Sequence, residues 1–314
     1  MTGEPEEEEK HYIVGHKQPD TDTIVSAIAY SRLQEASGRD AVAVRAGDLN
    51  PETEFVLEKF DVDEPELLED ASGKSVIMVD HNVYSQAVEG MEDAKVRQVI
   101  DHHRLGDIET SEPIYVRIEP VGSTATIITD MYLEAGVEID RKTSGLLLSG
   151  LLSDTVVLRS PTTTDVDRRV AGELAERAGV DYEEYGKEIL SKKSEIGEKS
   201  PREMILGDFK EYDWSGETVG IGQVETVEPE KVLEQKETLI DTMEDIGEER
   251  GYPLLVLLIT DLLEEHTEAF AVGKEKDRFE DALETEMDDS QASLPGVMSR
   301  KKQVVPPLEE SFQG

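Results

Sequence analysis

Four short polar segments each follow an apolar run typical of a buried strand or helix. They are G-H-K-Q-P-D-T-D at residues 15–22, D-H-N at 80–82, D-H-H at 101–103 and S-D-T at 153–155. In an open parallel sheet, ligands bind outside the carboxyl ends of the strands, where loops from distant parts of the chain converge. The sequence therefore predicts one site built from all four segments.

The side chains in these segments are suited to a pair of divalent metal ions. Two such ions about 3.5–4 Å apart can hold a nucleophilic water and clamp a phosphoryl group. The candidate ligands are two imidazoles and four carboxylates: His16, Asp20, Asp22, Asp80, His102 and Asp154. A set of nitrogen and oxygen ligands favours manganese or cobalt with an open water position.

Each segment alone has a simpler interpretation. Asp154 is typical of a turn or a helix cap, and Asp20 and Asp22 could be ordinary loop acids in an acidic protein. Asp101-His102-His103 is harder to explain in this way, because such a triplet is costly to bury without partners. The coincidence of four segments at similar positions favours the metal site.

A small group of basic residues contrasts with the acidic background. Arg300-Lys301-Lys302 is the only run of three positive residues in the chain, and Lys210 lies within a predicted strand. The run could be a solvated tail, and the lysine could be an ordinary residue of an edge strand. Beside a metal site, both would suit the binding of a small polyanion.

The composition limits the possible partners. The chain has 314 residues, with 32 Lys+Arg against 72 Asp+Glu, a net charge of −40. Such a surface disfavours nucleic acid and anionic membranes. A solvated charged surface explains most of the acids, and a halophilic adaptation is a hypothesis that melting temperature measured against salt would test. The absence of cysteine excludes disulfides and thiolate metal sites.

No membrane segment is expected. The first ten residues are acidic and polar, unlike a signal peptide, and the longest apolar run, residues 253–259, is too short to span a bilayer. The sequence predicts a soluble, cytoplasmic protein.

The first part of the chain alternates strand and helix patterns, which predicts an α/β fold with a doubly wound parallel sheet. Strands are expected at residues 12–14, 41–45, 75–79 and 96–100. Helices are expected at residues 23–36, 51–60, 123–133, 145–152, 165–177 and 182–192, with Asn50 and Ser123 as N-caps and Gly136 as a C-terminal stop.

A change of pattern predicts a second domain. We expect an N-terminal domain at residues 1–190, a polar linker at 191–202 and a smaller C-terminal α/β domain with a mixed sheet at 203–314. Its expected strands are residues 204–214, 217–225, 254–260 and 269–272, the first two forming a hairpin around Ser215-Gly216, and its expected helices are residues 229–249 and 277–286.

These motifs resemble the DHH phosphoesterases, and within them the family II, manganese-dependent, inorganic pyrophosphatases. The four polar segments are similar to the family's four N-terminal motifs, and S-R-K-K-Q at 299–303 resembles the signature of its C-terminal domain. Gln18 stands where the family usually has Asn, which we expect to alter a contact around the ligands rather than remove a ligand.

The resemblance implies a division of roles among the candidate residues. His16, Asp20 and Asp80 match the ligands of one metal, and Asp22, Asp80, His102 and Asp154 match those of the other, with Asp80 bridging. His103, Lys210, Arg300 and Lys301 match positions that contact pyrophosphate oxygens. The implied cofactors are two Mn²⁺ per subunit, which Co²⁺ could replace, and Mg²⁺ arriving with the substrate.

The resemblance also implies a hydrolase whose active site lies in the cleft between two domains, and a homodimer formed through the N-terminal domain. Hydroxide activated by two metals would cleave pyrophosphate into two orthophosphates while the basic residues clamp the substrate. A short-chain exopolyphosphatase or another DHH phosphoesterase is the alternative. Nucleotide-cleaving relatives resemble one another in a Gly-Gly-x-Gly-His string, which this chain lacks. A non-catalytic acidic, metal-buffering protein is a further alternative, but it would not require the histidine spacing.

Overall fold

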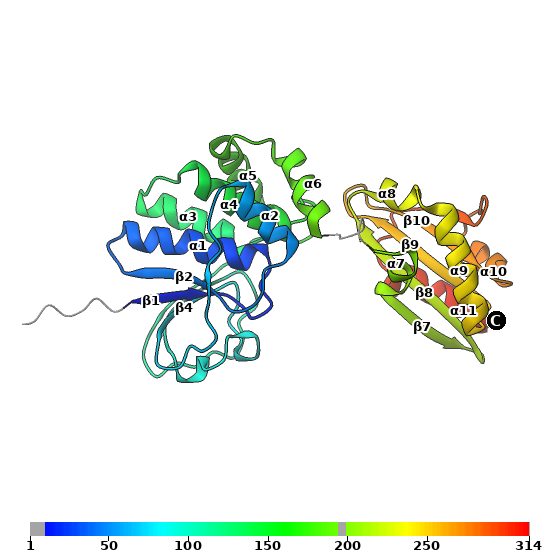
Figure 1. Cartoon of the computed structure of the whole chain (residues 1–314), viewed down its shortest axis with the longest axis horizontal. Helices are drawn as coiled ribbons and strands as arrows, with labels where there is room; N and C mark the ends of the chain where they lie inside the picture. Colours follow the sequence, from blue (N-terminus) through cyan, green and yellow to red (C-terminus); the bar gives the residue numbers. More distant parts are fainter. Residues whose placement is uncertain (1–9, 194–198, 314) are drawn as a thin grey trace, which may run out of the picture. The chain divides into compact units, whose positions relative to one another are not determined.

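The computed structural model describes residues 10–193 and 199–313. The chain divides into two compact units, Met1–Lys193 and Ser194–Gly314, which are described separately (Figure 1). The predicted linker at 191–202 lies partly outside the described residues. On either side of residues 194–198, helices α6 (Tyr182–Lys193) and α7 (Pro201–Gly207) occupy much of the remainder of the predicted linker.

Unit 1 contains a six-stranded sheet in the order β3-β2-β1-β4-β5-β6, with every neighbouring pair parallel. The strands are β1 (His11–Val14), β2 (Ala41–Arg45), β3 (Glu66–Leu67), β4 (Ser75–Val79), β5 (Lys95–Asp101) and β6 (Tyr115–Ile118). The central strand β4 is buried at every position, as its continuous apolar sequence requires. The parallel sheet confirms the predicted α/β class.

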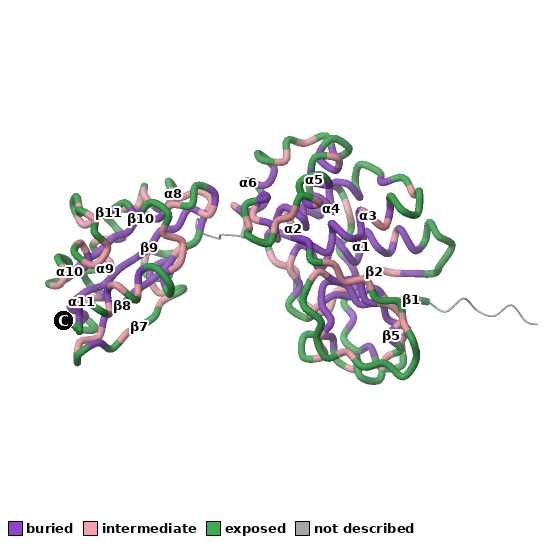
Figure 2. The backbone as a smooth tube through the Cα atoms, turned by 180° about the vertical axis from the view of Figure 1, so that it is seen from behind, coloured by how far each residue is buried: buried purple, intermediate pink, exposed green. Residues whose placement is uncertain are grey.

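The strand order reverses direction between β1 and β4, which creates the crevice where open α/β sheets bind ligands. Helix α1 (Thr21–Ala36) packs on β1 and β2, and its other side contacts α3 (Thr124–Ala135) and α4 (Arg141–Asp154). Figure 2 shows that α1 and α4 are buried along much of their length. Unit 1 also contains α2 (Pro51–Lys59) and α5 (Asp165–Ala178).

The other face of this sheet is covered differently. The short 3₁₀ turns Tyr84–Gln86 and Met91–Asp93 and the segment around them supply the buried side chains Ala87, Val88 and Met91. These side chains pack with Val76 and Met78 of β4, so irregular chain takes the place of a second layer of helices.

The cap residues set the helix ends as the sequence predicted. Asn50 and Ser123 accept hydrogen bonds from Thr53 N and Thr126 N at the starts of α2 and α3. Gly136 ends α3 in the left-handed region, at φ 65°. Among the described residues, none of the helices has the length and apolar character needed to cross a membrane.

Unit 2 contains a mixed five-stranded sheet in the order β11-β10-β9-β8-β7, in which only β8 and β9 run parallel. The strands are β7 (Phe209–Trp214), β8 (Glu217–Thr226), β9 (Leu255–Asp261), β10 (His266–Val272) and β11 (Gln291–Pro295). The predicted hairpin is confirmed: Ser215 and Gly216 both have positive φ, at 50° and 88°, as a tight two-residue turn requires. An apolar cluster covers each face of this sheet.

Several predicted boundaries in unit 2 are wrong. The strand expected from residue 204 begins at Phe209, because Ser200 and Glu203 form a capping box that starts α7. The helix expected at 229–249 is interrupted at Gln235 and forms α8 (Pro229–Leu233) and α9 (Lys236–Arg250). The helix expected at 277–286 is α10 (Lys276–Ala282), shorter at its C-terminal end.

The final segment is not a solvated tail. Residues Arg300–Val304 form a π-helical turn that leads into α11 (Val305–Gln313). Leu308 and Phe312 of α11 are buried in one of the two apolar clusters of unit 2. Pro306 and Pro307 lie in the first turn of α11, directly after this π-helical turn.

Gly145 in α4 allows an aromatic ring to approach the helix closely. A Cβ at this position would lie 2.2 Å from Cε1 of Phe60. We expect Gly145→Ala to lower the melting temperature, because overpacking costs about 1–3 kcal/mol and outweighs the gain of about 1 kcal/mol in helix propensity.

Gly172, in the exposed middle of α5, is the matched control, since a Cβ there meets nothing within 4 Å. Gly172→Ala should raise the melting temperature. Thermal unfolding of both variants measures the two effects, and stabilisation by Gly145→Ala would contradict the packing argument.

Candidate metal centre

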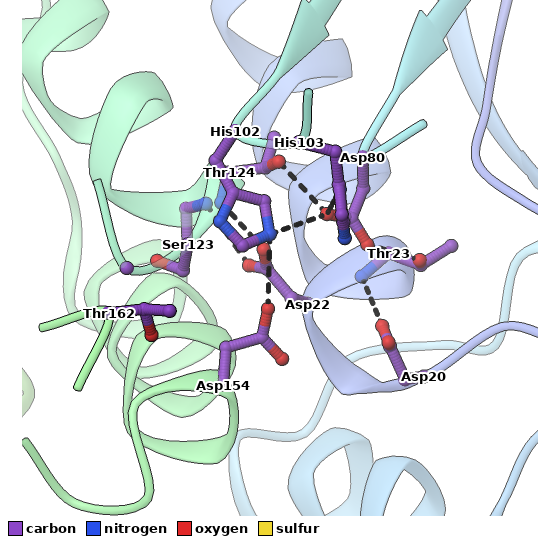
Figure 3. Close-up of polar contacts among 12 residues, drawn as sticks. Asp20, Asp22, Thr23, Asp80, His102, His103, Ser123, Thr124, Asp154 and Thr162 are labelled. Atoms are coloured by element: carbon purple, nitrogen blue, oxygen red, sulfur yellow. Dashed lines mark hydrogen bonds and ion pairs between the residues drawn. The ribbon is translucent and has the colours of Figure 1, made fainter. Parts of the chain in front are cut away.

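The four polar segments meet at the carboxyl edge of the unit 1 sheet (Figure 3). His16 follows β1, Asp80 follows β4 and His102 follows β5, while Asp154 is the last residue of α4. Asp20 is the N-cap of α1, and Asp22 lies in the first turn of this helix. The structure thus brings together the six residues that the sequence predicted as metal ligands.

The six side chains form two groups that share Asp80. Ligand atoms of Asp22, Asp80, His102 and Asp154 lie within 4.8 Å of one another, and so do those of His16, Asp20 and Asp80. We call the first set the four-residue group and the second the three-residue group. A further set joins Asp80 and His102 to His103.

The distances within the groups suit a cation better than direct hydrogen bonds. His102 Nε2 lies 3.5 Å from Asp80 Oδ1 and 3.4 Å from Asp154 Oδ2. His16 Nε2 lies 3.5 Å from Asp20 Oδ2 and 3.8 Å from Asp80 Oδ2. Ligands about 2.0–2.2 Å from a tetrahedral ion are separated by about 3.4 Å.

The charge of the cluster calls for cations. Burial raises the pKa of Asp80 well above its ordinary range, and the nearby carboxylates of Asp22, Asp20 and Asp154 raise it further. Burial raises the pKa of Asp22 as well. Burial also opposes ionisation of Asp20, but the nearby imidazole of His16 and the hydrogen bonds from Thr23 outweigh it and lower the pKa of Asp20 to about 2. Divalent cations would stabilise all of these carboxylates in their charged form.

One ring nitrogen of His102 is free to bind a metal. Its Nδ1 lies 3.1 Å from the carbonyl oxygen of Val121, which can only accept, so Nδ1 carries the proton. Its Nε2 is buried, has no hydrogen-bond partner in the part of the chain that the structure describes, and lies close to Asp80 and Asp154. A backbone carbonyl that fixes the tautomer in this way is the usual arrangement of a metal-binding histidine. The residues therefore fit divalent ions.

Partners that sequence reasoning missed hold the buried carboxylates. Thr23 Oγ1 donates to Asp80 Oδ2 at 2.5 Å, and Thr124 Oγ1 donates to Asp80 Oδ1 at 3.0 Å. Asp22 accepts from the backbone N–H groups of Thr124 and Ala125, at 2.6 and 3.0 Å, where the N-terminus of α3 is electropositive. The predicted cap at Ser123 indicated where α3 starts. It did not indicate that the first N–H groups of α3 bind Asp22.

His103 is a half-exposed histidine beside the metal groups. Its Nδ1 hydrogen-bonds to Asp101 Oδ1 at 2.9 Å and lies 3.9 Å from Asp80 Oδ1. The hydrogen bond to Asp101 raises the pKa of His103. Asp101 is itself buried and also accepts from Asn82 Nδ2. An exposed ring with a raised pKa at this place can contact an anion.

Two other histidines near the motifs lie outside the metal groups. His11 Nδ1 contacts Ser75 Oγ at 2.8 Å, on the sheet. His81 is buried, its Nδ1 lies 3.0 Å from the carbonyl oxygen of Val79, and burial lowers its pKa to about 4. His81 is therefore a neutral residue behind the site.

Gln18 lines a cavity of about 160 Å³ in front of the metal groups. The other lining residues are His16, Lys17, Asp80, Gln86 and His103. Gln18 is exposed and lines this cavity together with the shared residue Asp80.

The predicted substrate-binding residues of unit 2 gather around the start of β7. Arg300 is 8% exposed, and its guanidinium donates to the carbonyl oxygens of Asp208 and Ile221 and to Asp208 Oδ1, at 2.6, 3.3 and 2.8 Å. Ile221 is the strand partner of Lys210 in the hairpin. Lys210 and Lys301 are exposed. Arg300 is thus a fixed, structured cation.

Both halves of the chain match known families. Residues 10–151 match the model of the DHH family N-terminal domain, and residues 187–311 match that of the DHHA2 domain. A manganese-dependent inorganic pyrophosphatase of Methanocaldococcus jannaschii is 47% identical over 312 residues, covering 96% of this chain and 99% of the relative. One of Methanothrix thermoacetophila is 41% identical over 305 residues, covering 96% and 98%.

Solved structures show the same relationship. A crystal structure described as a family II inorganic pyrophosphatase of Methanococcus jannaschii matches with a TM-score of 0.60 at 47% identity, over 97% of this chain and 100% of that one. An exopolyphosphatase-related protein of Bacteroides fragilis, at 15% identity and a TM-score of 0.52 over 98% and 92%, shares the fold.

The parallel sheet, the cluster of aspartate and histidine at its carboxyl edge and the two domain matches define a phosphoesterase of the DHH type. Within this class, the chain belongs to the family II, manganese-dependent, inorganic pyrophosphatases.

Asp80 is the residue common to both metal groups, so its loss should affect both. We expect Asp80→Ala to weaken Mn²⁺ binding at least 100-fold, beyond the effect of removing a residue that only supports a ligand. Isothermal titration calorimetry measures this, and the exposed Asp63→Ala is the control. Full Mn²⁺ binding by Asp80→Ala would show that the centre lies elsewhere.

Proposed function

We propose that this protein hydrolyses inorganic pyrophosphate to two orthophosphates with two Mn²⁺ ions per subunit. The observation that carries the proposal is the pair of carboxylate–histidine groups that share the buried Asp80. Family membership and the activity in the names of relatives at 41–47% identity support the substrate. Co²⁺ could substitute at the same nitrogen and oxygen ligands, and Mg²⁺ would accompany the substrate.

When bound, two divalent cations lower the pKa of a coordinated water and polarise phosphoryl oxygens. The chain's own residues prepare the place for this chemistry. Asp80 would bridge the two ions, and the hydroxyls of Thr23 and Thr124 keep its carboxylate oriented. His102 would present its Nε2 to a cation, because its Nδ1 donates to the carbonyl oxygen of Val121.

We assign the basic residues to the substrate. His103 lies beside Asp80, and its exposed ring, whose pKa is raised by the hydrogen bond to Asp101, can bind a phosphoryl oxygen. Lys210, Arg300 and Lys301 would bind the distal phosphate and neutralise charge on the leaving group. The exposed lysines are free to move toward an anion, whereas Arg300 offers the donors that Asp208 and Ile221 leave unused.

A homodimer formed through unit 1 also belongs to this proposal. Among the described residues, the edge strand β6 pairs only with β5, and it carries Tyr115 and Val116, each 49% exposed. An unpaired edge bearing large apolar side chains suits association with a second copy. Sedimentation velocity of the purified protein would test this.

A comparison of substrates tests the proposed activity. The Mn²⁺-loaded protein is offered pyrophosphate, tripolyphosphate and a short oligonucleotide at equal concentration, and released phosphate or nucleotide is measured. We expect pyrophosphate to have the highest kcat/KM. Preference for tripolyphosphate would favour an exopolyphosphatase, and preference for the oligonucleotide would overturn the assignment.

Removal of one basic residue separates substrate binding from metal binding. We expect Lys301→Ala to reduce kcat/KM about 10-fold or more, as the loss of a charge-assisted contact of about 1.5–3 kcal/mol implies, with unchanged Mn²⁺ affinity. Lys302→Ala, at the neighbouring exposed lysine, is the control. Loss of Mn²⁺ binding in Lys301→Ala would contradict this division of roles.

A further inference from the structure

A buried carboxylate outside the metal groups binds the segment that supports them. Asp167 of α5 is fully buried. Its hydrogen bonds with Thr164 form the capping box at the start of α5, which is an ordinary local role. Its other bonds reach a distant part of the chain: Gly122 N donates to both oxygens at 3.0 and 2.9 Å, and Thr126 Oγ1 donates to Oδ1 at 2.7 Å.

Residues 121–126, which we call the support segment, hold three metal ligands on their other side. The carbonyl oxygen of Val121 accepts from His102 Nδ1. The hydroxyl of Thr124 donates to Asp80, and the N–H groups of Thr124 and Ala125 donate to Asp22. Figure 3 shows Thr124 and Ser123 beside these ligands.

The support segment has little room to move. Ser123, Thr124 and Thr126 are fully buried. A Cβ on Gly122 would lie 2.5 Å from Cγ2 of Thr155, the residue after Asp154, and 2.9 Å from Asp167 Oδ2. The segment is therefore packed between Asp167 and the C-terminal end of α4, which carries the fourth ligand.

All of these contacts lead to one metal group. Asp22, Asp80 and His102 belong to the four-residue group, and Thr155 adjoins its fourth member. Within the described residues, the hydrogen bonds of the support segment reach neither His16 nor Asp20. Asp20 is held instead within its own helix, by Thr23 N at 2.9 Å.

We propose that Asp167 is a positioning residue that sets the affinity of the four-residue group for its cation and leaves the three-residue group nearly unaffected. This inference rests on the proposed two-cation centre. The carboxylate accepts at both oxygens from the support segment and from Thr164. An asparagine has almost the same shape, but its amide NH₂ cannot accept a hydrogen bond. Either the hydroxyl of Thr126 or the donors of Thr164 would then lose their acceptor.

Mn²⁺ titration of Asp167→Asn by calorimetry tests the proposal, with Asp165→Asn as control, an exposed acid in the first turn of the same helix. Wild type and Asp165→Asn should bind two Mn²⁺. In Asp167→Asn we expect one site to weaken about 10–100-fold, the usual effect of losing a group that orients ligands. The other site should change much less, because only the shared Asp80 links it to the support segment.

Thr126→Val, which removes a single donor to Asp167, should change the same site in the same direction but by a smaller factor. Melting temperatures of the metal-free proteins report general destabilisation, which would weaken both sites together. Equal weakening of both sites, or two unchanged sites, in Asp167→Asn would overturn the proposal while the proposed function stands. If the wild-type protein bound no Mn²⁺, the proposed function and this inference would both fail.

Discussion

The crowding of buried carboxylates around Asp80 is the constraint on which the rest of this structure depends. Asp80 and Asp22 are removed from water and lie near two further acids, so each disfavours the ionised form of the others. The fold offsets this with hydroxyl donors and with the N-terminus of α3. Such donors stabilise the cluster only in part, and divalent cations supply the remaining charge.

The topology of unit 1 makes that crowding possible. Because the strand order reverses between β1 and β4, the loops after these strands separate and leave a crevice at the carboxyl edge. Helices α1, α3 and α4 then direct their termini into it, so that the acids are attached to rigid elements rather than to long loops. Helices α1 and α3 also pack on the sheet, and α4 packs on α1 and α3, so stability and ligand geometry depend on the same contacts.

Local signals predicted much of the fold, and the errors arose where such signals were obscured or absent. The N-caps at Asn50 and Ser123 were predicted correctly, because a cap depends on neighbours within one helical turn. The capping box at Ser200 was present but was obscured by an apolar pattern that continues into β7. The edge strands β6 and β11 were missed because few of their residues are buried, so tertiary pairing and not periodicity defines them.

The sequence by itself determined the kinds of ligand, the four segments that carry them and the α/β class, because residue type and strand or helix period are local properties. The −40 net charge also follows from it, although only four of the acids belong to the proposed metal ligands. The resemblance implied that two ligand sets share Asp80. Only the tertiary structure decided which tautomer His102 adopts, that Thr124 binds Asp80, and that Asp167 binds the segment which contacts these ligands. These depend on contacts between residues tens of positions apart, which no local pattern encodes.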